Sequence, residues 1–197
     1  MQAAKTSHTL LDSEDSVLIA IDIQNAFLDK LPVQESERLL SRACWLIGVA
    51  QWKQIPMVVT AEEFDKQPLA SKLIECLPAG VPVLNKASFR LAHQPEILKT
   101  VEQTGRKTAV LIGLETDVCV AQSAIGLLQE GYRVAVVTDA TGTTAPGQEI
   151  GLNRMQNAGT IIVSTKSLFY EWMRTVEMVN RFHRECPDMR DLAGFAL

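Results

Sequence analysis

The sequence lacks several features that would place it in a particular class of protein. No apolar run approaches the ~20 residues of a membrane-spanning helix, and residues 1–16 contain no hydrophobic segment typical of a secretory signal. There is no run of like charges, and a net charge of -4 gives no support to a nucleic-acid or membrane partner. We therefore expect a cytoplasmic protein that acts on a small molecule.

Cysteine is also sparse, and its spacing matches no metal or disulfide motif. The four cysteines are far apart in the chain and form no CxxC pair: Cys44, Cys76, Cys119 and Cys186. This spacing argues against a disulfide framework and against a cysteine-based zinc site, and it favours a reducing compartment.

Length and composition favour one globular domain. The chain has 197 residues, 47% of them hydrophobic, which is enough for one substantial core. We find no repeat, linker or low-complexity tract. We expect a single domain over residues 1–197, with an N-terminal arm at 1–15 and a C-terminal tail at 185–197.

Apolar runs of strand length alternate with segments of helical periodicity along the chain. Strands are predicted at residues 16–22, 56–60, 81–84, 107–112, 133–139 and 160–164. Helices are predicted at residues 34–53, 69–77, 95–103, 116–130, 146–157 and 167–184, and a polar loop at 61–67. This alternation predicts an α/β fold with a six-stranded parallel, doubly wound sheet and helices on both faces.

Three chemically reactive side chains lie at or just beyond the carboxyl ends of these predicted strands. Asp22 ends the first strand, Lys86 follows the third, and Cys119 lies in the first turn of the helix after the fourth. Ligands of open α/β sheets bind beyond these strand ends, so we expect the three to share one edge. With Thr116 as N-cap, the helix dipole would favour the thiolate of Cys119.

Each of these residues also has an ordinary structural interpretation. Asp22 is equally compatible with a helix cap or a turn, and most lysines, including Lys86, are simply solvated. Cys119 is compatible with a buried structural cysteine, because free cysteine is among the most buried residue types.

The segments around these residues resemble the isochorismatase-like cysteine hydrolases. The resemblance is carried by IDIQNAF around Asp22, NKASF around Lys86, and GLETDVCV around Cys119, followed by GYRVAVVTDAT. The three segments occur in the order and spacing of the family, from about residue 16 to residue 164. The resemblance implies a six-stranded parallel sheet, an Asp-Lys-Cys triad and an oxyanion site built on a cis peptide, here Leu114-Glu115.

The resemblance also implies a reaction. Family members with this cysteine mostly hydrolyse small amides or ureido compounds. In that chemistry Asp22 would accept the Cys119 proton, and Lys86 would keep the carboxylate ionised and favour the thiolate. Backbone N–H groups of Glu115 and Cys119 would stabilise the oxyanion. A further set would form the walls of the substrate pocket: Asn25, Phe27, Phe89 and Glu115.

Two departures from relatives limit the choice of substrate. Nicotinamidases of the family place an Asp and two His as a metal site after the second strand, whereas residues 60–65 here contain no histidine. We therefore expect no metal and no cofactor, and we do not favour nicotinamide. Isochorismatases proper cleave a vinyl ether and do not need the cysteine, so the presence of Cys119 favours acyl chemistry.

Two alternatives to a cysteine amidase remain. The first is vinyl-ether hydrolysis with Asp22 as the acid. The second is a binding module whose Cys119 thiol is redox-sensitive or inert. For any of these functions we expect a homo-oligomer, a dimer or a tetramer, from the resemblance and from the apolar residues of the last predicted helix.

Overall fold

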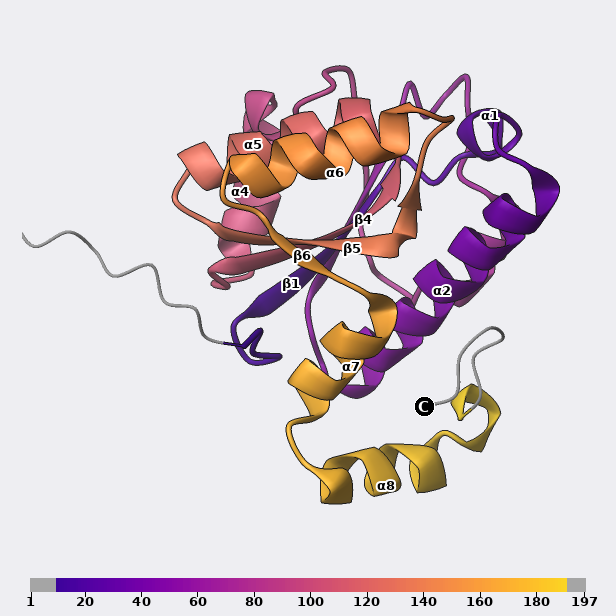
Figure 1. The fold of residues 1–197 in the computed structure, drawn as a ribbon, viewed down its shortest axis with the longest axis vertical. Helices are drawn as coiled ribbons and strands as arrows, with labels where there is room; N and C mark the ends of the chain where they lie inside the picture. Colours follow the sequence, from indigo (N-terminus) through magenta and orange to yellow (C-terminus); the bar gives the residue numbers. More distant parts are fainter. Residues whose placement is uncertain (1–9, 191–197) are drawn as a thin grey trace, which may run out of the picture.

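The structure, a computed structural model, describes residues 10–190 and contains one parallel sheet (Figure 1). Its six strands are arranged in the order β3-β2-β1-β4-β5-β6. Their bounds are β1 Ser16–Ile21, β2 Met57–Glu62, β3 Val83–Lys86, β4 Thr108–Leu114, β5 Arg133–Gly142 and β6 Ile161–Val163. The predicted six-stranded parallel sheet is confirmed, and β1 and β4 form its buried centre.

Helices cover both faces of the sheet, as the sequence predicts (Figure 1). The sheet separates two hydrophobic cores, one on each face. One face is covered by α2 (Val33–Trp52), α3 (Ser71–Cys76) and α7 (Thr165–Met173). The other is covered by α4 (Pro95–Gln103), α5 (Ala121–Gln129) and α6 (Gly147–Asn157). The short elements are α1 (Asn25–Leu28), η1 (Leu91–His93), η2 (Thr116–Val120) and η3 (Pro187–Met189).

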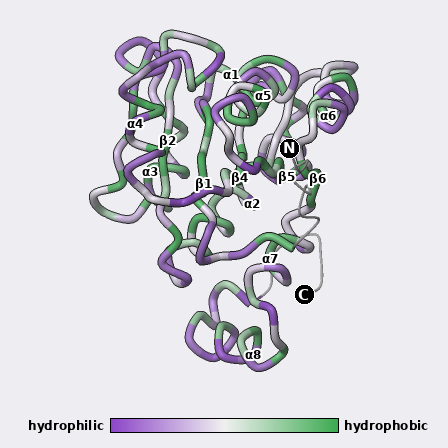
Figure 2. The backbone as a smooth tube through the Cα atoms, turned by 90° about the vertical axis from the view of Figure 1, so that its left-hand side faces the viewer, coloured by the Kyte–Doolittle hydropathy of each residue, from purple (hydrophilic) through white to green (hydrophobic). Residues whose placement is uncertain are grey.

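The predicted helix over residues 167–184 is wrong as a single element. Arg174 adopts φ 63°, which ends α7, and Thr175 caps a new helix, α8 (Val176–Glu185), by accepting a hydrogen bond from Met178 N. Helix α8 lies at one end of the molecule (Figure 2). Val176 is 77% exposed. Phe182 is the side chain of α8 that is fully buried.

Parts of the predicted arm and tail are packed. Within the described part of the arm, Leu11 is fully buried, and Asp15 O accepts a hydrogen bond from Thr108 N at the start of β4. Within the described part of the tail, Met189 O accepts a hydrogen bond from Trp45 Nε1. Residues 1–9 and 191–197 lie outside the described residues. In the described range, no helix combines the length and the apolar character needed to cross a membrane.

One cysteine prediction is contradicted. The structure joins Cys44 of α2 to Cys76 of α3 in a disulfide, across 32 residues of sequence, whereas the spacing argued against such pairing. Because α2 and α3 pack on the same face of the sheet, the two Cα atoms come within 5.5 Å, a distance typical of disulfides. The remaining cysteines, Cys119 and Cys186, are free.

Glycine at position 113 allows the two central strands to meet closely. Gly113 has φ 125°, and a Cβ built on it would overlap the carbonyl oxygen of Ile21 at the end of β1. The register of β4 with β5 also shifts between Leu111 and Gly113. The turn that carries Cys119 begins three residues later, so this glycine fixes where that turn starts relative to β1.

Substitution of Gly113 should therefore lower the free energy of unfolding by more than the strain of a positive φ alone would. Gly131 also has a positive φ of 84°, but no atom lies within 4 Å of a Cβ built there. We expect Gly131→Ala to cost about 1–2 kcal/mol for the left-handed conformation, and Gly113→Ala to cost roughly 1–3 kcal/mol more for the overlap. Urea unfolding measures both, and equal losses would contradict the close approach.

Candidate active site

The candidate site lies where the strand order of the sheet reverses. Strands β1 and β4 are neighbours at the centre, and chain connections leave them toward opposite edges of the sheet. This is the topological switch point, at which open α/β sheets bind ligands beyond the carboxyl ends of the strands. Asp22 follows β1 directly, and Cys119 follows β4 on the single helical turn η2.

Lys86 joins the two other predicted residues into one cluster. It is the last residue of β3, and its Nζ lies 2.8 Å from Asp22 Oδ2 and 3.5 Å from Cys119 Sγ. The side chains of Asp22 and Lys86 are 0% exposed, and Cys119 is 2% exposed. Asp22 also accepts a hydrogen bond from Thr60 Oγ1 at 3.0 Å. The structure thus brings together all three side chains that the strand-end argument selected.

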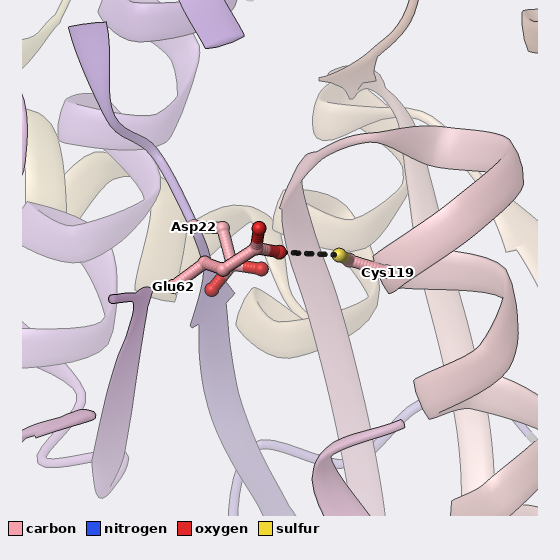
Figure 3. Close-up of side chains that lie close together, drawn as sticks. All are labelled: Asp22, Glu62 and Cys119. Carbon is pink, nitrogen blue, oxygen red and sulfur yellow. Dashed lines mark hydrogen bonds between the residues drawn. The ribbon is translucent and has the colours of Figure 1, made fainter. Parts of the chain in front are cut away.

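A fourth member of the cluster, Glu62, was missed from the sequence. Its Oε2 lies 3.7 Å from Cys119 Sγ and 3.8 Å from Lys86 Nζ (Figure 3). Residues 61–67 were predicted as a loop, but β2 continues through Glu62, which is paired in register with Lys86. Its position in the sequence could have identified it, because Glu62 ends a strand at the same edge of the sheet as Asp22 and Lys86.

Gln24, which was also missed from the sequence, binds the backbone of Glu62 through its side-chain amide. Gln24 is fully buried; its Oε1 accepts from Glu62 N at 2.7 Å and its Nε2 donates to Glu62 O at 2.8 Å. A second bond from Nε2 reaches the carbonyl of Gln67. The amide therefore ties the segment after β1 to the end of β2, and it fixes the two carboxylates relative to each other.

Burial and charge set the protonation of the cluster. Burial raises the pKa of Asp22, and the neighbouring Lys86 ammonium offsets this only in part. Burial alone would lower the pKa of Lys86, but the charges of Asp22 and Cys119 outweigh it, so that pKa is raised. Burial and the charge of Asp22 raise the pKa of the Cys119 thiol to about 12.

The expectation of a thiolate stabilised by the helix dipole is therefore wrong for the resting protein. The residues before α5 form a π-helical turn, η2, with no side-chain cap. Thr116 was predicted as the N-cap, but it does not act as one, because its Oγ1 donates a hydrogen bond to Gln148 Oε1 of α6 at 2.6 Å. Desolvation and the adjacent carboxylate dominate at this position, so Cys119 rests as a thiol that needs a base.

The turn carrying Cys119 is held on both sides. Before it, the Leu114-Glu115 peptide is cis, as the resemblance implied. Behind it, two glycines of α6 allow close contact: a Cβ at Gly147 would lie 2.5 Å from Asp117 Oδ2, and one at Gly151 would lie 2.8 Å from Asp117 Cα. These contacts leave the turn little room to move, and so they fix the position of the sulfur.

The predicted pocket residues fall into two groups. Glu115 Oε1 pairs with Lys30 Nζ at 3.0 Å, and the same Nζ lies 4.7 Å from the centre of the Phe27 ring. Phe89 is 52% exposed, and its ring centre lies 6.0 Å from Lys86 Nζ. Asn25 is exposed at the start of α1. Phe89 is thus linked directly to the cluster, whereas Phe27 and Glu115 are linked to each other through Lys30.

The ligand atoms of three side chains are close enough together to be compared with a metal site. Asp22, Glu62 and Cys119 each offer one ligand atom within 4.8 Å of the others. The ammonium of Lys86 lies within 3.8 Å of one such atom from each of the three. The positive charge of Lys86 therefore already faces these three side chains, and the four together form an ion-pair cluster.

Fold and site together define a doubly wound α/β protein with an Asp-Lys-Cys cluster at the switch point. Residues 16–167 match the model of the isochorismatase domain, and the chain belongs to the isochorismatase family.

Individual relatives cover nearly the whole chain. The probable hydrolase YcaC of Escherichia coli is 26% identical over 190 residues, 92% of this chain and 91% of its own. Its crystal structure, an octameric hydrolase of unknown specificity, has a TM-score of 0.79 at 24% identity and covers 93% of this chain and 94% of its own.

Two further solved structures are similar. YcaC from Pseudomonas aeruginosa, solved with hexane-2,5-diol and covalent acrylamide, has a TM-score of 0.78 at 26% identity and covers 93% of this chain and 95% of its own. N-carbamoylsarcosine amidase from Thermoplasma acidophilum has a TM-score of 0.65 at 22% identity and covers 77% of this chain and 96% of its own. The second likeness shows the shared fold.

The raised thiol pKa gives a test by alkylation in a Cys186→Ser background, where Cys119 is the one free cysteine. The rate with iodoacetamide should rise with pH without a plateau below about pH 10, as expected for a thiol of pKa about 12. Because the charge of Asp22 raises this pKa, Asp22→Asn should speed alkylation at pH 8 by about tenfold or more. The exposed Asp65→Asn is the control, and slower alkylation of Asp22→Asn would contradict this electrostatic account.

The buried ion pair gives a separate test of stability. Lys86→Met leaves the Asp22 carboxylate buried without its cation, which should cost about 3–5 kcal/mol in the free energy of unfolding. The double variant Lys86→Met/Asp22→Asn should recover much of that loss, because no unpaired charge remains. Lys66→Met, which breaks an exposed pair with Glu63, should change stability little. Urea unfolding of all three decides this, and a double variant no more stable than Lys86→Met would be inconsistent with the pair.

Proposed function

We propose that the protein is a hydrolase that cleaves the C–N bond of a small amide or ureido compound through a thioester at Cys119. The observation that supports this most is the cluster itself: a thiol, a carboxylate and an ammonium in contact at the carboxyl edge of the sheet. Cys119 is nearly inaccessible and borders an apolar core, yet its sulfur also contacts the polar groups of Lys86 and Glu62.

Proton transfer would begin the reaction. Asp22 accepts the proton of Cys119, and the sulfur attacks the carbonyl carbon of the amide. Lys86 contacts both partners, so its charge stabilises the carboxylate before the transfer and the thiolate after it. Backbone N–H groups of Glu115 and Cys119 hold the oxyanion of the tetrahedral intermediate.

Asp22 would then act as an acid and later as a base. It donates its proton to the leaving nitrogen as the C–N bond breaks, which leaves an acyl group on the sulfur. In the second half of the reaction Asp22 removes a proton from water, and the hydroxide adds to the thioester. As the C–S bond breaks, Asp22 returns the proton to the sulfur, which regenerates the thiol and releases the acid. Each step leaves the charge of the enzyme unchanged at its end.

Relatives support parts of this proposal. YcaC of P. aeruginosa, at 26% identity, has been solved with covalent acrylamide, and YcaC of E. coli is named as a probable hydrolase. The fold is shared with an amidase that acts on N-carbamoylsarcosine. Because YcaC of E. coli is octameric, we also propose that this chain forms a homo-oligomer.

Ammonia release across a panel of small amides and ureas tests this function. Cys119→Ser and Asp22→Asn should each lower turnover by roughly 10³-fold or more, since one removes the nucleophile and the other its base. With an active substrate, an acyl adduct on Cys119 should be detectable by mass spectrometry after acid quenching. Because burial raises the pKa of Asp22, activity should fall on acidification at a pH above the ordinary carboxyl value of 3.8.

The remote thiol serves as the control for these variants. Cys186→Ser changes the other free cysteine and should leave turnover unchanged. Full turnover by Cys119→Ser on an identified amide would refute the thioester mechanism. Loss of activity in Asp22→Asn with none in Cys119→Ala would instead assign acid catalysis of the vinyl-ether type.

A further inference from the structure

We infer that Glu62 selects substrates that carry a positive charge next to the scissile carbonyl group. The inference rests on the proposed function for the reaction and on the geometry of four side chains for the charge preference. Glu62 is assigned no proton transfer in the reaction described above, and its Oε2 accepts a hydrogen bond from Cys119 Sγ at 3.7 Å, which places the carboxylate beside the reacting atom.

The first argument is that Lys86 has nearer partners than Glu62. Lys86 Nζ forms an ion pair with Asp22 Oδ2 at 2.8 Å and donates hydrogen bonds to Ser88 O at 3.0 Å and Cys119 Sγ at 3.5 Å. Glu62 Oε2, at 3.8 Å, lies beyond hydrogen-bond distance. The charge of Lys86 is thus matched by Asp22, and the cluster of two carboxylates and one ammonium carries one negative charge in excess.

The second argument is accessibility. The side chain of Glu62 is 24% exposed, whereas those of Asp22 and Lys86 are fully buried. Figure 3 shows the Glu62 carboxylate directed at the sulfur of Cys119, with a separation of 3.7 Å. A molecule approaching this sulfur from solvent therefore meets the Glu62 carboxylate within a few ångströms of the reacting atom.

The third argument concerns the other charges near the site. Glu115 is paired with Lys30 at 3.0 Å, and Glu63, next to Glu62 in sequence, is paired with Lys66 at 2.7 Å. In the described part of the chain, Glu62 thus lies beside the sulfur of Cys119 without a cation within hydrogen-bond distance, whereas these two neighbouring carboxylates are paired.

An aromatic ring adds to this preference. Phe89 is half exposed, and its ring centre lies 6.0 Å from the same Lys86 Nζ that Glu62 approaches to 3.8 Å. Both side chains thus lie near the Lys86 end of the cluster, and both are partly exposed; a carboxylate and an aromatic ring each attract cationic groups. The substrate class we infer is a small amide with an ammonium or amidinium group one or two bonds from the carbonyl carbon.

Charged thiol reagents test the preference without any knowledge of the substrate. Three methanethiosulfonates are used, with aminoethyl (cationic), methyl (neutral) and sulfonatoethyl (anionic) groups. The sulfur of Cys119 attacks the sulfenyl sulfur, the S–S bond forms, methanesulfinate leaves with the bonding electrons, and the thiol proton passes to Asp22 or solvent. Rates are measured in a Cys186→Ser background, so that Cys119 is the one free thiol.

The ratio of the cationic rate to the anionic rate is the result that decides. Burial and the charge of Asp22 raise the pKa of Cys119 most, but the charge of Glu62 raises it too, so replacing Glu62 changes the fraction of thiolate. That fraction affects both rates equally and cancels in their ratio. We expect a ratio of about tenfold or more in the parent at low salt, and a fall of about fivefold or more in Glu62→Gln. Glu63→Gln, with the same change of charge one residue away, should keep the parent ratio.

A ratio near one in the parent, or an unchanged ratio in Glu62→Gln, would overturn the inference. An equal fall in Glu63→Gln would also overturn it, because the effect would then be one of general surface charge.

Three small amides carry the test to catalysis: glycinamide (cationic) and propionamide (neutral), which are isosteric, and the larger malonamate (anionic). The enzyme should rank kcat/KM in that order, and Glu62→Gln should lower the ratio of glycinamide to propionamide about tenfold. Equal kcat/KM for the three amides would overturn the inference even if the amidase function holds. If no amide is hydrolysed, the proposed function fails, while the thiol reagents still decide the charge preference of the site.

Discussion

The buried contact between Lys86 and Asp22 is the interaction on which the rest of the site depends. Both side chains are fully buried, and Lys86 Nζ lies 2.8 Å from Asp22 Oδ2. A buried charge is tolerated only when it is paired and hydrogen-bonded. Neither residue could occupy its strand end without the other. The pair also places an ammonium group beside an apolar core, and Cys119 Sγ lies 3.5 Å from Lys86 Nζ.

Close backbone packing brings these groups to a common point. The sulfur must lie within reach of side chains from β1 and β3, although it is attached after β4. Gly113 allows β4 to approach β1, and Gly151 allows α6 to press on the η2 turn. The geometry of a few side-chain atoms is therefore determined by backbone contacts some distance away, which a packed interior transmits with little loss.

Much of this arrangement could be predicted from the sequence, for an identifiable reason. Strand β1 is buried along its whole length and reads as a continuous apolar run, so its end at Asp22 was located without a structure. The edge strand β3 is partly exposed, but its short apolar run still placed Lys86 at its end. Glu62 was missed because a polar residue after an apolar run can be either the last residue of a strand or the first residue of a loop. Only its pairing with Lys86 in the sheet shows that it belongs to the strand. The Cys44–Cys76 disulfide and the break at Arg174 depend on tertiary packing and capping, which hydrophobic periodicity does not record.

A thiol pKa of about 12 and a nucleophilic cysteine are compatible once charge is followed through the site. Transfer of the proton from Cys119 to Asp22 moves one negative charge from oxygen to sulfur and leaves the total unchanged. Lys86 contacts both atoms, so its stabilisation follows the charge, and the transfer needs no charge to enter or leave a buried site. Burial, which makes the free thiolate rare at rest, then strengthens each interaction at the moment when substrate is present and water is displaced.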